Sequence, residues 1–159
     1  MDDIGKHTFD KNIDEYWMRA ALAQADKASQ LGEIPIGAIV VQNKKIVGVG
    51  HNNSIGSTDP TAHAEVVALR DAAQKIGNYR LSGLDLYVTI EPCMMCAGAL
   101  VWARINRVVF GAKEPKTGAL ASIASVLDNP LLTHHVKVTG GILAAECAAK
   151  VKNFFGDRR

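Results

Sequence analysis

The sequence predicts an α/β fold, a three-layer α/β/α sandwich with a mixed sheet of about five strands. Three observations support this prediction. The chain has 159 residues, the usual length of one domain. No repeat, low-complexity tract or long linker divides it. A hairpin pattern is followed by helical and short apolar segments in alternation, which is typical of a sheet with helices on both faces. We therefore expect 1–159 to form a single domain, with 1–12 as an N-terminal extension.

The first half of the chain is expected to form a helix, two strands of a hairpin and a second helix. In chain order these are 12–31, 36–41, 45–50 and 59–76. Apolar residues recur at helical spacing in the first segment, and Gly32 is a natural helix stop. Two apolar runs around a short polar turn indicate the hairpin. Asp59 followed by Pro60 fits an N-cap with proline at the first helical position.

The second half is expected to alternate between strands and helices. The strands are predicted at 84–90, 107–111 and 136–138, where β-branched and other apolar residues gather. The helices are predicted at 93–104, 122–127 and 144–155. The last of them has an amphipathic pattern, and the middle one is short.

Composition excludes several classes of protein. Hydrophobic residues make up 48% of the chain and charged residues 21%, which excludes a disordered chain. A net charge of +2 permits binding to nucleic acid without arguing for it. The apolar runs are too short to span a membrane, and the N-terminus lacks the apolar core of a signal peptide. Three cysteines cannot all pair, so we expect a reducing, cytoplasmic location.

Two short segments carry the candidate chemistry: Thr61-Ala-His-Ala-Glu65 and Glu91-Pro-Cys-Met-Met-Cys96. Cys93 and Cys96 lie three residues apart at a predicted helix start, so both sulfurs share one face, and the positive end of the helix favours their thiolates. With His63 they supply three ligands. Zinc takes four, so one position stays open for water, as in a catalytic site.

Two other interpretations of these cysteines are weaker. His134 or His135 could supply a fourth ligand and close a structural zinc site, although both are distant in sequence. A Cys-x-x-Cys after a strand is also typical of a thioredoxin-like redox pair, but the second motif with His63 and Glu65 argues against that.

Taken together, the two motifs resemble those of the cytidine-deaminase superfamily of zinc deaminases, and most closely those of its bacterial tRNA-specific adenosine deaminases. The resemblance extends over nearly the whole chain. It rests on 59–65, Asn78-Tyr-Arg-Leu81, 91–99, Arg107-Val-Val-Phe-Gly-Ala112, Lys116-Thr-Gly118, Gly141-Ile-Leu143, Glu146-Cys147 and Phe154-Phe155.

The resemblance implies an enzyme that converts the wobble adenosine of a tRNA to inosine, using one Zn²⁺ per subunit. Glu65 would carry the protons, a role that its spacing from His63 does not itself show. Asn52 would hydrogen-bond the substrate; by sequence alone it is an ordinary turn residue. The substrate would be an unpaired base in the anticodon loop. The resemblance also implies a homodimer.

Some features fit more than one function. Trp102 and Ala121 depart from the family pattern. A deaminase of free guanine or cytosine, or a zinc-stabilised binding module without activity, would carry the same metal motif. Glu91 lies where a carboxylate favours a helix N-terminus, and it could also orient the metal site. The basic group Lys150, Lys152, Arg158 and Arg159 fits RNA phosphates and a solvated helix end about equally.

Overall fold

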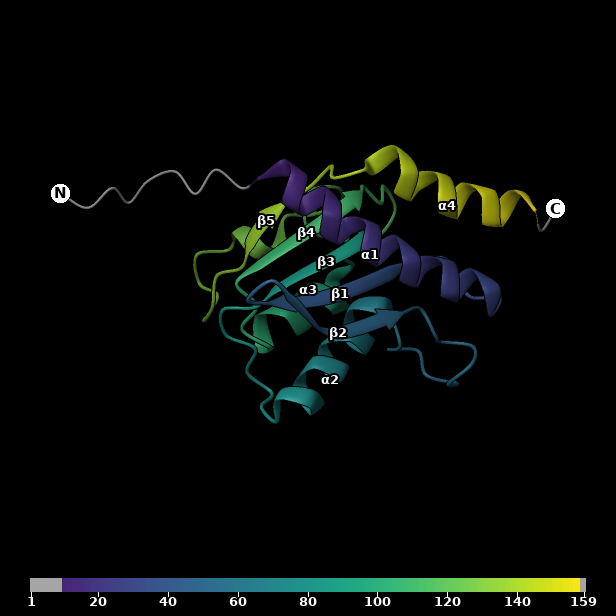
Figure 1. Ribbon diagram of the computed structural model, residues 1–159. Helices are drawn as coiled ribbons and strands as arrows, with labels where there is room; N and C mark the ends of the chain where they lie inside the picture. Colours follow the sequence, from purple (N-terminus) through teal and green to yellow (C-terminus); the bar gives the residue numbers. More distant parts are fainter. Residues whose placement is uncertain (1–9, 158–159) are drawn as a thin grey trace.

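A mixed sheet of five strands forms the centre of the protein in the computed structural model, which describes residues 10–157 (Figure 1). The elements are α1 (Lys11–Gln30), β1 (Gly37–Gln42), β2 (Lys45–His51), α2 (Ala64–Ile76), β3 (Asp85–Ile90), α3 (Met94–Trp102), β4 (Arg107–Ala112), the short 3-10 helix η1 (Val126–Asp128), β5 (Lys137–Thr139) and α4 (Ala144–Gly156).

The strands lie in the order β2-β1-β3-β4-β5. β1 pairs antiparallel with both β2 and β3, whereas β3, β4 and β5 run parallel to one another. Asn43 and Lys44 both have positive φ, 49° and 62°, as a two-residue hairpin turn between twisted strands requires. The predicted mixed sheet and its hairpin are confirmed.

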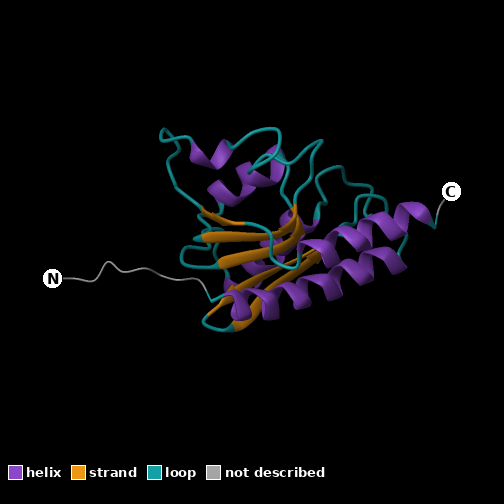
Figure 2. Ribbon diagram, turned by 90° about the horizontal axis from the view of Figure 1, so that it is seen from above, coloured by secondary structure: helices purple, strands orange, loops and turns teal. Residues whose placement is uncertain are grey.

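Two helices cover each face of the sheet. α1 and α4 pack on one face, where their apolar residues meet Ile39, Tyr87 and Val109. α2 and α3 pack on the other face, against Val40 and Val88 among others. Figure 1 shows the two layers on opposite sides of the sheet, and Figure 2 shows the two long helices of one layer side by side. The three-layer α/β/α sandwich is thus confirmed.

The start of α2 was predicted wrongly. The helix begins at Ala64, not at Asp59-Pro60. Asp59 uses its carboxylate in a local turn instead: it accepts hydrogen bonds from the amide and the hydroxyl of Thr61, at 2.8 and 2.7 Å. Such an Asx turn competes with helix capping. The amide of Ala64 is bound by Asn52, twelve residues upstream, at 2.9 Å.

The short helix predicted over 122–127 is also wrong. The segment holds only η1, which begins at Val126. Ser122 lies in the preceding loop, where its amide and its hydroxyl both donate hydrogen bonds to the carboxylate of Glu91. Of the proposed N-terminal extension, 1–9 lies outside the described residues, while Asp10 caps α1 by accepting a hydrogen bond from the amide of Asn12.

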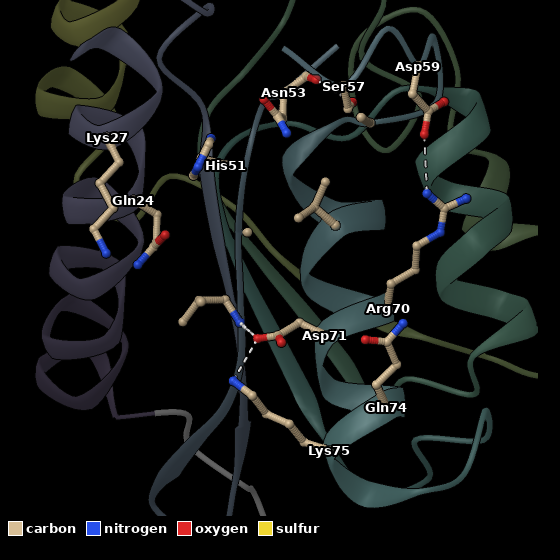
Figure 3. Close-up of a pocket in the computed structure, with 14 residues that line it drawn as sticks. Gln24, Lys27, His51, Asn53, Ser57, Asp59, Arg70, Asp71, Gln74 and Lys75 are labelled. Atoms are coloured by element: carbon tan, nitrogen blue, oxygen red, sulfur yellow. Dashed lines mark hydrogen bonds and ion pairs between the residues drawn. The ribbon is translucent and has the colours of Figure 1, made fainter. Parts of the chain in front are cut away.

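β2 is one of the two edge strands of the sheet, and a cavity of about 570 Å³ with mostly polar lining residues runs along it between α1 and α2 (Figure 3). Asp71 of α2 reaches across this edge and accepts hydrogen bonds from the amide of Val49 and from Lys75, each at 2.9 Å (Figure 3). An unpaired backbone amide on an edge strand can pair with a strand of another chain. The carboxylate of Asp71 binds the amide of Val49 and so prevents such pairing there.

Beneath α1, a buried ion pair ties that helix to the sheet. The carboxylate of Asp14 accepts hydrogen bonds from both terminal nitrogens of Arg107, at 2.6 and 3.0 Å. It also accepts one from the hydroxyl of Tyr87, at 2.9 Å. Both charged side chains are almost fully buried. Removing one partner would therefore leave a buried charge without its counter-charge.

We expect Asp14→Asn to lower the free energy of unfolding by about 3–5 kcal/mol, because the guanidinium of Arg107 loses its counter-charge in a buried site. Urea denaturation followed by circular dichroism measures the change. The matched control is Asp26→Asn, which breaks the exposed pair with Lys150 and is expected to cost less than about 1 kcal/mol. Equal losses in the two variants would show that burial of the Asp14 pair is unimportant.

Candidate metal centre and active site

The N-termini of α2 and α3 meet at the carboxyl end of β3. His63 is the N-cap residue of α2, and Cys93 is the N-cap residue of α3. Cys96 lies in the first turn of α3 and is fully buried. Ligands at the carboxyl end of a parallel strand, next to helix N-termini, occupy the usual place for a site in an α/β fold. The structure therefore brings together the three residues predicted as metal ligands.

The spacing of the three donor atoms fits a zinc ion. The Nδ1 atom of His63 lies 3.6 Å from the Sγ atoms of Cys93 and of Cys96. All three donor atoms lie within 4.8 Å of one another. A tetrahedral zinc with Zn–N of about 2.0 Å and Zn–S of about 2.3 Å separates nitrogen and sulfur ligands by about 3.5 Å, close to the spacing observed. This donor set suits zinc and leaves one of four positions open.

The two thiols have opposite tendencies to ionise. Hydrogen bonds from Cys96 and His63 lower the pKa of Cys93 to about 3. The hydrogen bond that Cys96 makes to Cys93, together with burial, raises the pKa of Cys96. A pair of thiols this close holds one negative charge readily and resists a second one. A divalent cation between them removes that conflict, since it binds both as thiolates.

Glu65 is buried beside the three ligands. Its side chain is only 4% exposed, and burial raises its pKa to about 7. The charges on Cys93 and His63 both act on this carboxyl, so it lies near the donor atoms although it is not in the group that could hold a metal. Sequence spacing did not establish this proximity. The two residues do not follow simple helical spacing, because His63 is the N-cap residue before α2 whereas Glu65 lies within the first turn of that helix.

Asn52 has a structural contact that orients its side chain. Its Oδ1 atom accepts the hydrogen bond from Ala64 that caps α2, which leaves the Nδ2 amide group directed elsewhere. The residue also lines the cavity next to His63 and Glu65. It is therefore more than an ordinary turn asparagine, because it combines a helix cap with a donor at the cavity wall.

A cavity of about 270 Å³ opens beside the metal ligands. Its walls come from the segment before β1, the end of β3, the two loops that flank the site, and α4: Ile34, Ile36, Asn52, His63, Glu65, Ile90, Glu91, Cys93, Glu114, Thr117, Val151 and Phe155. The volume is just below the usual range of ligand pockets, about 300–1,000 Å³, and suits one base. The larger cavity of Figure 3 lies elsewhere and lacks the metal-ligand group.

Two buried carboxylates that support this cavity were missed or misjudged from the sequence. Glu33, 3% exposed, accepts a hydrogen bond from the amide of Ile55 at 2.6 Å and so holds the loop 52–63. Glu91 does not cap α3. Its hydrogen bonds go to the loop 113–125, and despite burial they hold the pKa of this carboxyl below its ordinary value. Both interactions join residues more than twenty positions apart, which no local pattern reveals.

Other candidates lie apart from the site. His134 uses its Nε2 atom to donate to the carbonyl of Ile105 at 2.7 Å, because a carbonyl only accepts, and neither it nor His135 joins the metal-ligand group of the described residues. Lys150 forms an ion pair with Asp26 of α1 at 2.7 Å. Arg158 and Arg159 lie outside the described residues.

Comparisons with known proteins agree with this site. A family model of MafB19-like deaminases matches residues 12–159. The fold and the three-ligand site thus define a deaminase of the cytidine-deaminase-like class. The chain is 53% identical over 148 residues to the tRNA-specific adenosine deaminase of Haemophilus influenzae. This match covers 92% of this chain and 86% of that protein. The chain therefore belongs to the family of tRNA-specific adenosine deaminases.

Two solved structures illustrate the range of activities on this fold. One comes from work on A-to-I editing by tRNA:A34 deaminases at the wobble position of transfer RNA; it has a TM-score of 0.82 and 39% identity and covers 85% of this chain and 98% of its own. Another is the guanine deaminase of Bacillus subtilis, with a TM-score of 0.61 and 35% identity. The match covers 77% of this chain and 82% of that one. The fold alone does not determine the substrate.

We expect Cys96→Ser to lose most of its bound zinc after mild chelation, because a hydroxyl is a far poorer zinc ligand than a thiolate. Metal analysis of the purified protein measures this. Cys147→Ser is the matched control: Cys147 is also buried, but it packs between α4 and the sheet. Retention of zinc by Cys96→Ser would contradict the assigned ligand set.

Proposed function

We propose that this protein hydrolyses the 6-amino group of the wobble adenosine in the anticodon loop of a tRNA, producing inosine and ammonia. The observation that carries the proposal is the convergence of His63, Cys93 and Cys96 beside the buried Glu65. Three of these side chains, His63, Glu65 and Cys93, line a cavity that suits a single base. Identity of 53% to a tRNA-specific adenosine deaminase supports the choice of substrate.

His63, Cys93 and Cys96 would hold one Zn²⁺ per subunit. Zinc in such a site supplies Lewis acidity, which makes water a nucleophile near neutral pH. The three protein ligands bind through neutral imidazole nitrogen and two thiolate sulfurs, so the protein contributes two negative charges that offset the ion. The positive ends of α2 and α3 stabilise those thiolates further.

Glu65 would move the protons of the reaction. Its carboxylate takes a proton from the water that attacks C6 of the purine and passes it to N1. It then takes the remaining proton from the new C6 hydroxyl and gives it to the departing amino group, which leaves as ammonia while C6 becomes a carbonyl. This is general acid–base catalysis by one group that is reprotonated within each turnover. The burial of Glu65 in the wall of the cavity supports this role, because it would hold the carboxylate close to the reacting atoms.

Asn52 and the cavity walls would hold the base. With Oδ1 bound to Ala64, the Nδ2 group of Asn52 is left to donate to an acceptor nitrogen of the purine. Only a base that has left its stack can enter a cavity of this kind. The unpaired nucleotides of an anticodon loop satisfy that requirement without the cost of opening a stem.

A second candidate function is the deamination of a free base, which the likeness to the guanine deaminase of Bacillus subtilis favours. Incubation of the protein with unmodified tRNA, guanine and cytosine separates the two functions. Inosine in tRNA supports the main proposal, whereas ammonia from guanine or cytosine without inosine in tRNA overturns it. No turnover of any of these substrates would favour a zinc-stabilised binding module.

Glu65→Gln tests the proton carrier. We expect it to retain its zinc and to lose at least about 100-fold in the rate of inosine formation, the scale of a general acid–base contribution. Inosine is read as guanosine after reverse transcription of the tRNA. Glu146→Gln, in an exposed part of α4, is the control. Activity of Glu65→Gln close to that of the natural chain would assign the proton transfers to another group.

We further propose a homodimer that forms through α3. Met95, Gly98 and Trp102 share one face of this helix, and Trp102 is 75% exposed. The absence of a side chain at Gly98 permits close approach, since nothing lies within 4 Å of the position that its Cβ would take. Exposed apolar side chains in a contiguous stripe are typical of a protein interface.

Trp102→Glu is expected to shift the protein from dimer to monomer at micromolar concentration, because a charge would be buried in the interface. Light scattering after size exclusion measures the mass. Tyr16→Glu is the matched control: Tyr16 is 67% exposed, but it lies on α1, on the opposite side of the sheet. A monomeric natural chain, or loss of the dimer in the control alone, would contradict the interface.

Among the described residues, none of the helices has the length and apolar character needed to cross a membrane. A cytoplasmic location is part of the proposal for two other reasons. The proposed tRNA substrate requires access to tRNA, and Cys93 and Cys96 must stay reduced to act as ligands.

A further inference from the structure

Glu91 forms an unusually complete set of hydrogen bonds with one loop. The residue follows β3 directly and is 3% exposed. Its Oε1 atom accepts from the amide of Glu114 at 3.1 Å and from the hydroxyl of Ser122. Its Oε2 atom accepts from the amides of Leu120, Ala121 and Ser122, at 3.0, 2.8 and 3.1 Å. One buried carboxylate thus binds both ends of the loop 113–125.

The loop that Glu91 holds is one wall of the cavity. It joins the end of β4 to η1 and contains neither helix nor strand. Glu114 and Thr117 of this loop line the cavity beside the metal ligands. The loop has no ladder or helical turn, and acceptors within it bind only some of its amides, such as those of Gly118 and Ile123. Other amides of the loop depend on partners outside it. Glu91 supplies four of those amide contacts.

Steric contact at Gly118 independently shows how closely the loop fits around Glu91. A Cβ atom at Gly118 would lie 2.4 Å from the Cδ atom of Glu91 and 2.5 Å from each of its carboxylate oxygens. The loop therefore closes over the carboxylate at a distance that only glycine permits. Hydrogen bonding and packing point to the same pair of partners.

We propose that Glu91 is a positioning residue, which fixes the loop 113–125 as a wall of the base cavity and thereby sets the affinity for substrate. This inference rests on the proposed tRNA deaminase function. Without the carboxylate, the wall adopts its binding arrangement for only a fraction of the time. The apparent dissociation constant then rises by the inverse of that fraction, whereas saturating substrate restores the arrangement and with it the chemical step.

Glu91→Gln provides the test. However the amide is turned, its NH₂ group faces backbone amides that can only donate, so part of the network is lost. We expect KM for a tRNA anticodon stem-loop to rise on the order of tenfold with kcat nearly unchanged, as for a binding state that has become a minor population. Zinc content is expected to stay at one per chain. Hydrogen exchange measured without substrate is expected to accelerate in 113–125.

A second variant reaches the same contact from the loop. Gly118→Ala places a methyl group against the carboxylate and is expected to raise KM in the same way while Glu91 itself is intact. The control is Asp14→Asn, a buried carboxylate beneath α1 that contacts neither the loop nor the cavity. A loss of folded protein in that variant lowers the apparent kcat and leaves KM unchanged.

The outcomes separate the two proposals. A fall in kcat with unchanged KM in both Glu91→Gln and Gly118→Ala would overturn the positioning role, because the effect would then lie in the chemistry or in the folded fraction. Unchanged exchange of 113–125 in Glu91→Gln would also overturn it. If the natural chain forms no inosine in tRNA, the proposed function fails, while the exchange data still show whether Glu91 holds the loop.

Discussion

The site depends on one geometric constraint: two helix N-termini must converge on a single point at the end of β3. His63 and Cys93 are thirty residues apart in sequence, yet their donor atoms lie 3.6 Å apart. α2 reaches this position because it lies very close to the hairpin. A Cβ atom at Gly50 would come within 2.4 Å of the carbonyl of Ala64, so a larger residue there would push α2 and His63 away from α3.

Convergence also requires loops of fixed shape, and single buried side chains provide it. Asn52 caps α2 from the preceding loop, Glu33 holds the amides of that loop, and Glu91 holds the loop on the other side of the cavity. Each binds backbone donors of a segment that has no regular secondary structure or begins a helix. The walls of the cavity are therefore rigid where regular secondary structure is absent, which reduces the ordering that substrate binding must impose.

The order of the strands and of the four long helices was predictable, as were the three candidate ligands that the fold brings together, because they depend on local patterns. Apolar periodicity located every strand, and the donor types at 63, 93 and 96 indicated an open zinc site. The start of α2 was not predictable in this way. Asp59-Pro60 has the composition of a helix start, but Thr61 takes the carboxylate, and the cap comes from Asn52 in the loop after β2. The role of Glu91 was hidden for the same reason, since its partners lie 23 to 31 positions further along the chain.

The choice between adenosine and guanine must be made by the cavity walls. The metal ligands and Glu65 would serve the hydrolysis of either amino group. Asn52 offers a donor, and adenine and guanine both present acceptor nitrogens such as N7, so this contact does not separate them. The two bases differ in the carbon that carries the amine, C6 or C2, and hence in how the base must turn. For a base attached to RNA, the glycosidic bond limits that turn. Glu114, Thr117 and Phe155 line the cavity wall, so they are the groups that a turning base would meet. Substrate selection would therefore depend on the segments that carry those groups, the loop 113–125 and α4, more than on the metal centre.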